Sequence, residues 1–300
     1  MAMIISQCSL SVLRQSAEKL RAGDLVAFPT ETVYGIGADA ENKDAVARMY
    51  QVKNRPTGHP VIVHIAELND VDYWAREIPD YAIKLAKSFW PGPLTLLLHK
   101  APDVSPVVTG GLDTIGIRMP AHPALLALLQ QARLAVAAPS ANPYKKLSPT
   151  SCEQVLAGLQ GRIHAVLDGG FCQHGVESTI VDLTGQTIQI VRAGPITASQ
   201  LCAVLQQEVA QPTQHQVKVA GNVAAHYQPN APLICMTTAQ LTERINAATA
   251  DIAVLHYSPL PQSSKVHSLP MPPSAADYAS ALYRSFTRPC RSNPPDGAKA

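Results

Sequence analysis

Apolar residues follow two different periods along the first two hundred positions of the chain. Residues 11–22 place apolar side chains at helical spacing and end before Gly23, a residue type that often terminates helices. The β-branched run at 61–65 favours a strand instead. By these criteria, helices are predicted at 11–22, 44–53, 83–89, 123–133, 151–159 and 197–207, and strands at 25–28, 61–65, 94–99, 115–118, 134–138, 163–167, 179–183 and 187–191.

This alternation predicts the α/β class, with a mixed, twisted open sheet and flanking helices over residues 1–208. Residues 209–232 contain three prolines and no periodic element, so we expect a linker there. Beyond it, residues 233–287 predict a small, shortened parallel α/β domain. Its expected elements are a strand at 233–236, a helix at 238–248, a strand at 252–255 and a helix at 277–286. The proline-rich tail at 288–300 is predicted to be disordered.

Composition narrows the class of protein. Charged residues make up 15% of the chain and hydrophobic residues 46%, as expected of a folded globular protein, and a net charge of +2 gives no basis for strong nonspecific binding to nucleic acid. No basic segment resembling a secretory signal and no apolar run of roughly 18–20 residues is found, so no membrane association is expected. The six cysteines include no close pair, which disfavours structural zinc and indicates a reducing, cytoplasmic location.

Two polar segments adjoin predicted strands. FPTETVYGIG at 28–37 places hydroxyls and a carboxylate at a strand end, where open α/β sheets bind ligands, although an ordinary capped turn would have the same composition. In KNRPTGHPVIVHI at 53–65, Lys53 and Arg55 form a cation pair suited to phosphate, or solvated charges at a helix end. His64 lies in the following strand, where a histidine is more often a core residue than a ligand.

Three further segments carry polar groups. Arg118 in TIGIRMPAHP needs an anionic partner, either a ligand or an internal Asp or Glu. APSANPYKKLSPT offers Ser140, Asn142 and Ser148 after a strand, or only a Ser/Pro-rich turn. The glycine-rich DGGFCQHGVESTIVDL at 168–183 lacks the Walker, dinucleotide and GxSxG signatures, so it supports neither a P-loop enzyme nor a serine hydrolase.

Taken in order, these motifs resemble those of the threonylcarbamoyl-AMP synthases, the YrdC-type family, in its long two-domain form. The resemblance covers residues 10–207 densely and continues through Arg192-Ala193-Gly194 to His226-Tyr227-Gln228-Pro229. The matching segments are PTETVYG, Lys53-Asn54-Arg55, HPVIVHI, IRMP, Ser140-Ala141-Asn142, SPT and GVESTIVDL.

The resemblance implies a YrdC-like catalytic domain and a nucleotidyltransferase that makes L-threonylcarbamoyladenylate for threonylcarbamoyladenosine modification of tRNA. The implied substrates are L-threonine, bicarbonate and ATP with Mg²⁺, and pyrophosphate is released. The implied partners are downstream threonylcarbamoyl-transferase proteins, with weak binding of tRNA or double-stranded RNA as a further expectation. Such chemistry needs fixed cations and hydroxyl donors rather than a protein nucleophile.

Site residues follow from the resemblance position by position. The catalytic set is Lys53, Arg55, Ser140 and Asn142; the L-threonine set is Thr32, His64, Arg118, Ala138 and Ser178; and the ATP set is Arg55, His59, Thr114, Ser140, Ser148, Arg192 and Tyr227. No residue is assigned as a metal ligand. Since Tyr227 lies in the linker, that segment is expected to fold over the cleft as a lid.

The chain departs from the family pattern at a few positions. Tyr144-Lys145 stands where an aromatic-Gly pair is usual, Ala193 replaces a proline, and Gln228 replaces an alanine. Two other functions are alternatives: an RNA-binding module without catalysis, and a carbamoyl-transfer protein of hydrogenase maturation. The intact Lys53, Arg55, Ser140 and Asn142 set argues against the first, and the absence of zinc-finger cysteines argues against the second.

Overall fold

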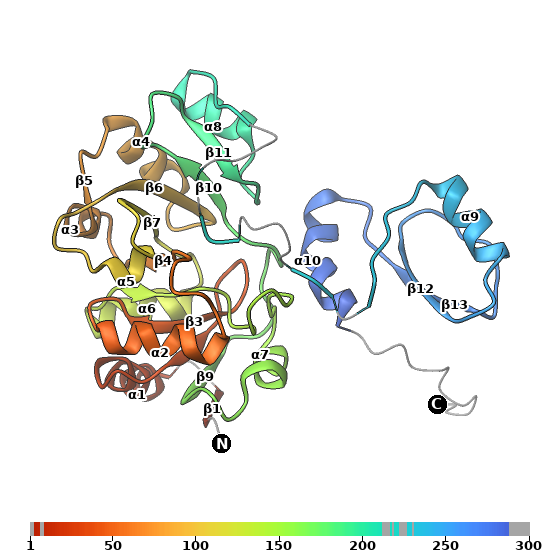
Figure 1. The fold of residues 1–300 in the computed structure, drawn as a ribbon, viewed down its shortest axis with the longest axis horizontal. Helices are drawn as coiled ribbons and strands as arrows, with labels where there is room; N and C mark the ends of the chain where they lie inside the picture. Colours follow the sequence, from red (N-terminus) through yellow and green to blue (C-terminus); the bar gives the residue numbers. More distant parts are fainter. Residues whose placement is uncertain are drawn as a thin grey trace. The chain divides into compact units, whose positions relative to one another are not determined.

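The computed structural model describes residues 3–6, 9–211, 217, 219–221, 227–229 and 231–287. The chain forms two compact units, Met1–Gln228 and Pro229–Ala300 (Figure 1). We call these the larger and the smaller unit. The predicted tail at 288–300 lies outside the described residues, and the finer domain boundaries stay predictions.

The larger unit is built on one mixed sheet, as the sequence predicted (Figure 1). The strand order is β1-β9-β2-β3-β8-β4-β7-β6-β10-β11, and β5 pairs with β6. Neighbours run parallel at β4–β7 and β6–β10 and antiparallel at β6–β7. The strands are β1 (Met3–Ser6), β2 (Val26–Phe28), β3 (Gly35–Asp39), β4 (Ile62–His64), β5 (Ala75–Arg76), β6 (Leu94–Lys100), β7 (Thr114–Arg118), β8 (Val136–Ala137), β9 (Ala165–Asp168), β10 (Thr179–Asp182) and β11 (Gln189–Arg192).

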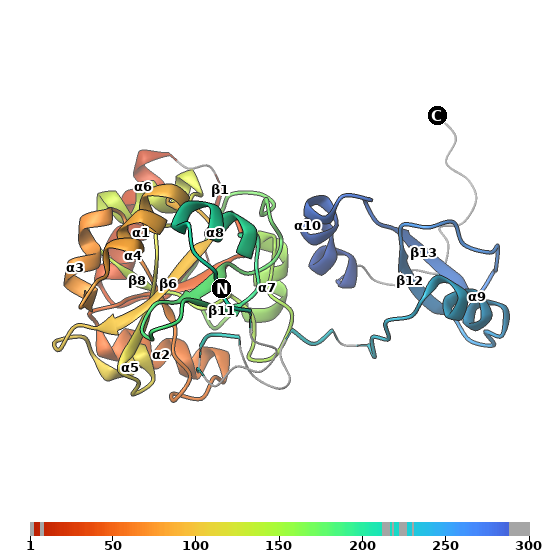
Figure 2. The ribbon, with the colours of Figure 1, turned by 90° about the horizontal axis from the view of Figure 1, so that it is seen from above.

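Helices lie on both sides of this sheet (Figure 2). Side chains of α1 and α6 form one core cluster with every second residue of β2 and β9, while α2, α4, α7 and α8 contribute to a cluster with the alternate residues. This division follows from the two-residue period of strands. The helices are α1 (Leu10–Arg21), α2 (Lys43–Lys53), α3 (Val71–Trp74), α4 (Asp80–Phe89), α5 (Pro106–Thr109), α6 (Pro123–Ala132), α7 (Cys152–Leu159) and α8 (Ala198–Leu205), with a 3₁₀ turn at Leu68–Asp70. Within the described residues, no helix is long and apolar enough to cross a membrane.

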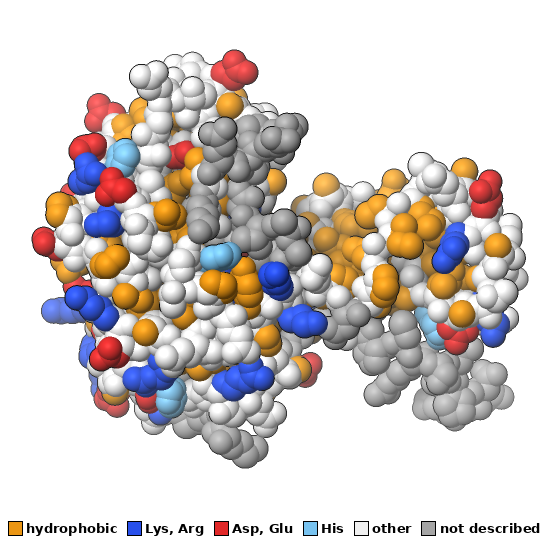
Figure 3. All heavy atoms as spheres, in the orientation of Figure 1, with side chains coloured by type: hydrophobic (Ala, Val, Ile, Leu, Met, Phe, Trp, Pro, Cys, Tyr) orange, Lys and Arg blue, Asp and Glu red, His pale blue; other side chains and the backbone are white. Residues whose placement is uncertain are grey.

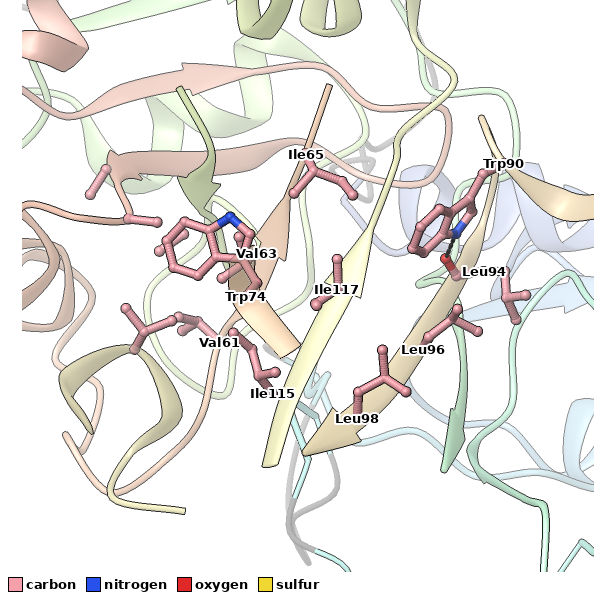
Figure 4. Packing of buried hydrophobic residues seen from close by; sticks show 14 of the residues in the cluster. Val61, Val63, Ile65, Trp74, Trp90, Leu94, Leu96, Leu98, Ile115 and Ile117 are labelled. Carbon is pink, nitrogen blue, oxygen red and sulfur yellow. Dashed lines mark hydrogen bonds between the residues drawn. The ribbon is translucent and has the colours of Figure 1, made fainter. Parts of the chain in front are cut away.

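The core under the central strands is built from alternating aliphatic side chains (Figure 4). Each buried side chain of this kind stabilises the fold by about 1.5–3 kcal/mol. The Trp90 indole donates a 2.7 Å hydrogen bond to the carbonyl of Leu94, so its polar atom is satisfied within this apolar layer. The labelled residues are Val61, Val63, Ile65, Trp74, Trp90, Leu94, Leu96, Leu98, Ile115 and Ile117.

One strand of the sheet, β3, was not among the predicted elements. β3 follows β2 in antiparallel pairing and also pairs with β8. Its glycines masked the strand signal because glycine has low strand propensity. They are needed where the Phe28 ring crosses β3: a Cβ at Gly37 would lie 2.4 Å from that ring, and one at Gly35 would lie 3.0 Å from it. The short elements β1, β5, α3 and α5 were also not predicted.

The smaller unit contains α9 (Thr238–Asn246), β12 (Ile252–His256), β13 (Val266–Pro270) and α10 (Ala275–Phe286). β12 and β13 pair in parallel, which confirms the predicted parallel α/β character. The strand predicted at 233–236 is wrong: Leu233 and Ile234 are 55% and 63% exposed and form no ladder. β13 was missed because strand pairing depends on a distant partner, which a proline-rich local sequence does not reveal.

Candidate active site

A narrow pocket of about 50 Å³ opens in the larger unit at the ends of β4 and β7. Loops that follow β2, β8 and β9 complete its wall together with part of the segment after α8. Strand ends in α/β sheets are the usual place for ligands, so the position agrees with the sequence-based expectation. The lining residues are Thr30, Thr32, Val33, Gly35, Arg55, Ile62, His64, Arg118, Ala138, Pro139, Ser140, Glu177, Ser178, Arg192, Ala220, Gly221 and Tyr227.

The alternation of β4 and β7 turns two polar side chains toward the pocket. Val63 and Ile117 face the core, so their neighbours His64 and Arg118 face the opposite side. His64 and Arg118 are register partners in the parallel β4–β7 pair and therefore lie side by side. Gly116 of β7 has little room for a side chain, because an added Cβ would lie 3.3 Å from Thr95 and 3.4 Å from Ile62.

Arg118 has an internal anionic partner. Its guanidinium donates to the Glu31 carboxylate at 2.5 Å, to the Thr32 hydroxyl at 3.0 Å and to the Gly92 carbonyl at 3.2 Å. These bonds use three of the five N–H groups, so each terminal nitrogen keeps one N–H for a ligand. Of the two anionic partners that the sequence allowed for Arg118, the internal carboxylate is present as Glu31. A ligand bound at Arg118 would be a second anionic partner.

The contacts of Glu31 with Arg118 and Ala121 favour the ionised form of its carboxylate. Burial alone would raise the pKa of Glu31, but the charge and hydrogen bond of Arg118, with the amide N–H of Ala121 at 3.0 Å, hold it below the usual value. Burial, and next the charge of Arg118, lowers the pKa of His64 to about 3. His64 is therefore neutral, and its Nδ1 has no hydrogen-bond partner among the described residues. An unpaired ring nitrogen beside a pocket is suited to a polar ligand.

Lys53 and Asn142 do not line the pocket; they support the loop that does. The Lys53 ammonium is buried and donates to the main-chain carbonyls of Ser140 and Asn142. The Asn142 amide donates to the carbonyls of Pro143 and Lys146, both at 2.8 Å. Burial, and then the charge of Arg55, holds the pKa of Lys53 well below its usual value. Ser140 lies on the pocket wall that these bonds shape.

Arg55 lies on the pocket wall beside an aromatic side chain. It donates to the Pro60 carbonyl at 2.9 Å, and its guanidinium carbon is 5.8 Å from the centre of the Tyr144 ring. Tyr144 in turn contacts His59 through its hydroxyl, 3.2 Å from Nδ1. His59 is thus one residue removed from the pocket, and Tyr144 is a contact that the sequence did not assign.

Arg192 ties two parts of the wall together. It donates to the Ser178 carbonyl at 3.0 Å, to the Ser178 hydroxyl at 2.8 Å and to the Ala220 carbonyl at 2.8 Å. Arg192 therefore links the segment after α8 to Ser178, the residue before β10, and Tyr227 from this segment reaches the pocket. The amide of Gln228 donates to the Lys145 carbonyl at 3.0 Å, which fixes the neighbourhood of Tyr227 to the loop after Asn142.

Nine of the predicted site residues line the pocket together. They are Thr32, Arg55, His64, Arg118, Ala138, Ser140, Ser178, Arg192 and Tyr227. Five do not line it: Lys53, His59, Thr114, Asn142 and Ser148. Thr114 begins β7 and pairs with His99, whereas Ser148 donates a hydrogen bond to Glu177, which does line the pocket. The division between threonine and ATP contacts stays a prediction.

Two carboxylates of the site were not assigned from the sequence. Glu31 and Glu177 are both inside quoted motifs, PTETVYG and GVESTIVDL, next to assigned residues. Their position beside Thr32 and Ser178 was the available signal. Sequence spacing alone does not show that Glu31 accepts a hydrogen bond from Arg118, or that Glu177 accepts one from Ser148.

Comparisons with known proteins agree with this architecture. Residues 18–194 match the Sua5_yciO_yrdC family model, described as telomere recombination, and residues 196–288 match the model of the threonylcarbamoyl-AMP synthase C-terminal domain. Threonylcarbamoyl-AMP synthase of Pyrococcus abyssi is 43% identical over 227 residues, covering 74% of this chain and 67% of the relative. The Bacillus subtilis protein of that name is 45% identical over 229 residues, covering 74% and 66%. The chain thus spans about two thirds of the length of these relatives.

Solved structures give the same result. The structure of P. abyssi Sua5 complexed with L-threonine has a TM-score of 0.87 and 34% identity, and the match covers 95% of this chain and 88% of that one. Escherichia coli YciO has a TM-score of 0.59 at 23% identity over 67% of this chain, a likeness in fold alone.

Proposed function

The chain belongs to the Sua5/YciO/YrdC family of threonylcarbamoyl-AMP synthases, and from that premise we propose that it joins L-threonine, bicarbonate and ATP into threonylcarbamoyl-AMP and pyrophosphate. The observation that supports this activity is the convergence of Arg55, Arg118 and Arg192 on one pocket from distant parts of the chain. Three fixed guanidinium groups suit a reaction that brings a carboxylate and a triphosphate together.

In this proposal, threonine occupies the part of the pocket next to β4 and β7. Its carboxylate takes the two remaining N–H groups of Arg118, and the neutral His64 offers its unpaired nitrogen to a polar group of the amino acid. A P. abyssi relative has been solved with L-threonine, which supports this choice of amino acid. Thr32 and Ser178 supply hydroxyls at the same wall.

The chemistry needs no protein nucleophile. The threonine amine, once deprotonated, attacks bicarbonate to give a carbamate and water. A carbamate oxygen then attacks the α-phosphorus of ATP, the bond from that phosphorus to the β-bridging oxygen breaks, and pyrophosphate leaves. Arg55 and Arg192 would stabilise the charge that builds on the phosphates, because they are already held by hydrogen bonds and need little reorganisation.

Magnesium is expected to accompany ATP. The part of the chain that the structure describes holds no group of three or more His, Cys, Asp or Glu side chains able to bind a metal ion by itself. Mg²⁺ needs only one or two protein carboxylates where phosphate oxygens supply further ligands, and the pocket has a carboxylate in Glu177. When bound, the ion would neutralise charge on the triphosphate.

The product would serve tRNA modification through a downstream threonylcarbamoyl-transferase. Transient contact with tRNA fits the surface better than strong binding does. On the face shown in Figure 3, Lys and Arg side chains are interspersed with Asp and Glu, and the net charge of the chain is only +2.

Mass-spectrometric detection of threonylcarbamoyl-AMP tests the proposed function. Purified full-length protein should form it from threonine, bicarbonate and MgATP, and omission of any one should abolish it. Pyrophosphate release should depend on threonine in the same way. Folded protein that releases pyrophosphate equally without threonine, or makes no adduct, would refute the assignment.

A further inference from the structure

Glu177 places a negative charge in a pocket whose other ionised side chains are arginines. Among the described residues that line it, Glu177 is the sole carboxylate, beside Arg55, Arg118 and Arg192. It is 9% exposed, so solvent does not screen it well. The Ser148 hydroxyl donates its one proton to this carboxylate.

Two neighbours of Glu177, Ser148 and Tyr227, belong to the predicted ATP set, although the adjacent Ser178 belongs to the predicted threonine set. Burial raises the pKa of Tyr227, and the nearby charge of Glu177 raises it further. The threonine side, by contrast, already has its own carboxylate, Glu31, which is bonded to Arg118.

A carboxylate beside a triphosphate is repulsive unless a cation lies between them. Carboxylate and phosphate oxygens are together the ligands that Mg²⁺ prefers, and P-loop enzymes hold their magnesium with an acidic side chain and a hydroxyl residue. We propose that Glu177 is the protein ligand of the magnesium ion that enters with ATP, and that Ser148 orients its carboxylate. This inference rests on the proposed function.

If Glu177 binds Mg²⁺, the substitution Glu177→Gln should change nucleotide affinity in opposite directions with and without Mg²⁺. Glu177→Gln removes the ligand charge and also removes the repulsion. It should therefore weaken binding of α,β-methylene-ATP in the presence of Mg²⁺ but strengthen binding of the same nucleotide in EDTA. The gain in affinity that Mg²⁺ gives should fall by about 10- to 100-fold, the range seen when groups that tune a metal site are lost.

Calorimetry on the full chain measures the four affinities, with Glu18→Gln, an exposed carboxylate on α1, as the matched control. Ser148→Ala should reduce the magnesium effect in the same direction without strengthening the metal-free complex, because the repulsive charge remains. Circular dichroism and thermal melting check that each variant is folded.

Other outcomes would refute the proposal that Glu177 binds Mg²⁺. Equal weakening with and without Mg²⁺ would assign Glu177 a structural role. Loss of threonine binding with an unchanged magnesium effect would make Glu177 a receptor for the threonine ammonium group. Wild-type protein that forms threonylcarbamoyl-AMP while Glu177→Gln keeps the full magnesium effect would refute this inference alone. Wild-type protein that binds no nucleotide would refute the proposed function and the magnesium site together.

Discussion

The guanidinium of Arg118 lies 2.5 Å from the carboxylate of Glu31, and both side chains are buried. Desolvation of such a pair is costly and offsets its attraction, so the pair contributes to the position of Arg118 more than to net stability. Glu31 also accepts a hydrogen bond from the Ala121 amide, which anchors it to the chain after β7. The orientation of Arg118 toward the pocket is thus fixed before any ligand arrives.

Glu31→Gln should destabilise the larger unit and weaken threonine binding. The amide keeps the shape but leaves Arg118 without a buried counter-charge, a loss of about 3 kcal/mol in the free energy of unfolding. Urea denaturation and threonine calorimetry measure the two effects, with Glu18→Gln as the control. A stability unchanged within about 0.5 kcal/mol would show that water or another group compensates Arg118.

Stability should fall on mild acidification because of His64. In the unfolded chain this histidine takes up a proton near pH 6.5, but in the folded chain it does so only near pH 3. Between these values the unfolded state binds more protons, so this one group lowers the free energy of unfolding by about 1.4 kcal/mol per pH unit as the pH falls. Urea denaturation at pH 6, 5 and 4 should show this slope in the wild-type protein and a smaller slope in His64→Gln.

Arg55→Ala and Arg118→Ala should affect different substrates. Arg55 is predicted to contact ATP and Arg118 threonine, and loss of a charge-assisted contact costs about 2–4 kcal/mol, or roughly 30- to 1000-fold in affinity. Calorimetry with each substrate separates the two. Threonine affinity that is unchanged in folded Arg118→Ala would remove Arg118 from the threonine site.

The resemblance to the threonylcarbamoyl-AMP synthases made most of this site predictable, and the two-residue period of strands explains how two of its side chains reach the pocket. Because Val63 and Ile117 are apolar members of β-type runs, their neighbours His64 and Arg118 had to emerge on the opposite face. The motif order then placed most assigned side chains on one pocket. The parallel pairing of β4 and β7 brings His64 and Arg118 side by side, whereas β8 runs antiparallel to β4 and contributes Ala138 from the opposite direction.

What the sequence did not predict depends on contacts between distant segments. From the sequence, Lys53 and Arg55 were either a cation pair for phosphate or solvated charges at a helix end, yet Lys53 is buried behind the wall and bonds to the carbonyls of Ser140 and Asn142. A lysine at a helix end can point toward the pocket or away from it. Here the carbonyls of the loop at 140–142 determine its direction. Likewise, β3 was not predicted because its glycines weaken the strand signal. They are required by the close approach of the Phe28 ring from the neighbouring strand β2, which the local sequence does not reveal.

Gly221→Ala should impair ATP use by displacing Tyr227 from the pocket. Gly221 has a φ of +88°, and a Cβ there would lie 2.1 Å from the Tyr227 hydroxyl, too close for the side chain to stay in place. Gly161→Ala is a matched control, because Gly161 has a similar φ of +79° but no atom within 4 Å of an added Cβ. Both variants carry the backbone strain, about 1 kcal/mol or more, but only Gly221→Ala also moves Tyr227.

The steady-state constants separate these two effects. If Tyr227 closes over the nucleotide, the KM for ATP should rise about tenfold or more in Gly221→Ala and stay near the wild-type value in Gly161→Ala, while Tyr227→Phe tests the hydroxyl by itself. Equal losses in both glycine variants would mean that strain, and not the position of Tyr227, limits the enzyme. A KM unchanged in Gly221→Ala would show that ATP binds without Tyr227 in the place seen here, and the segment after α8 would then have no part in holding the nucleotide.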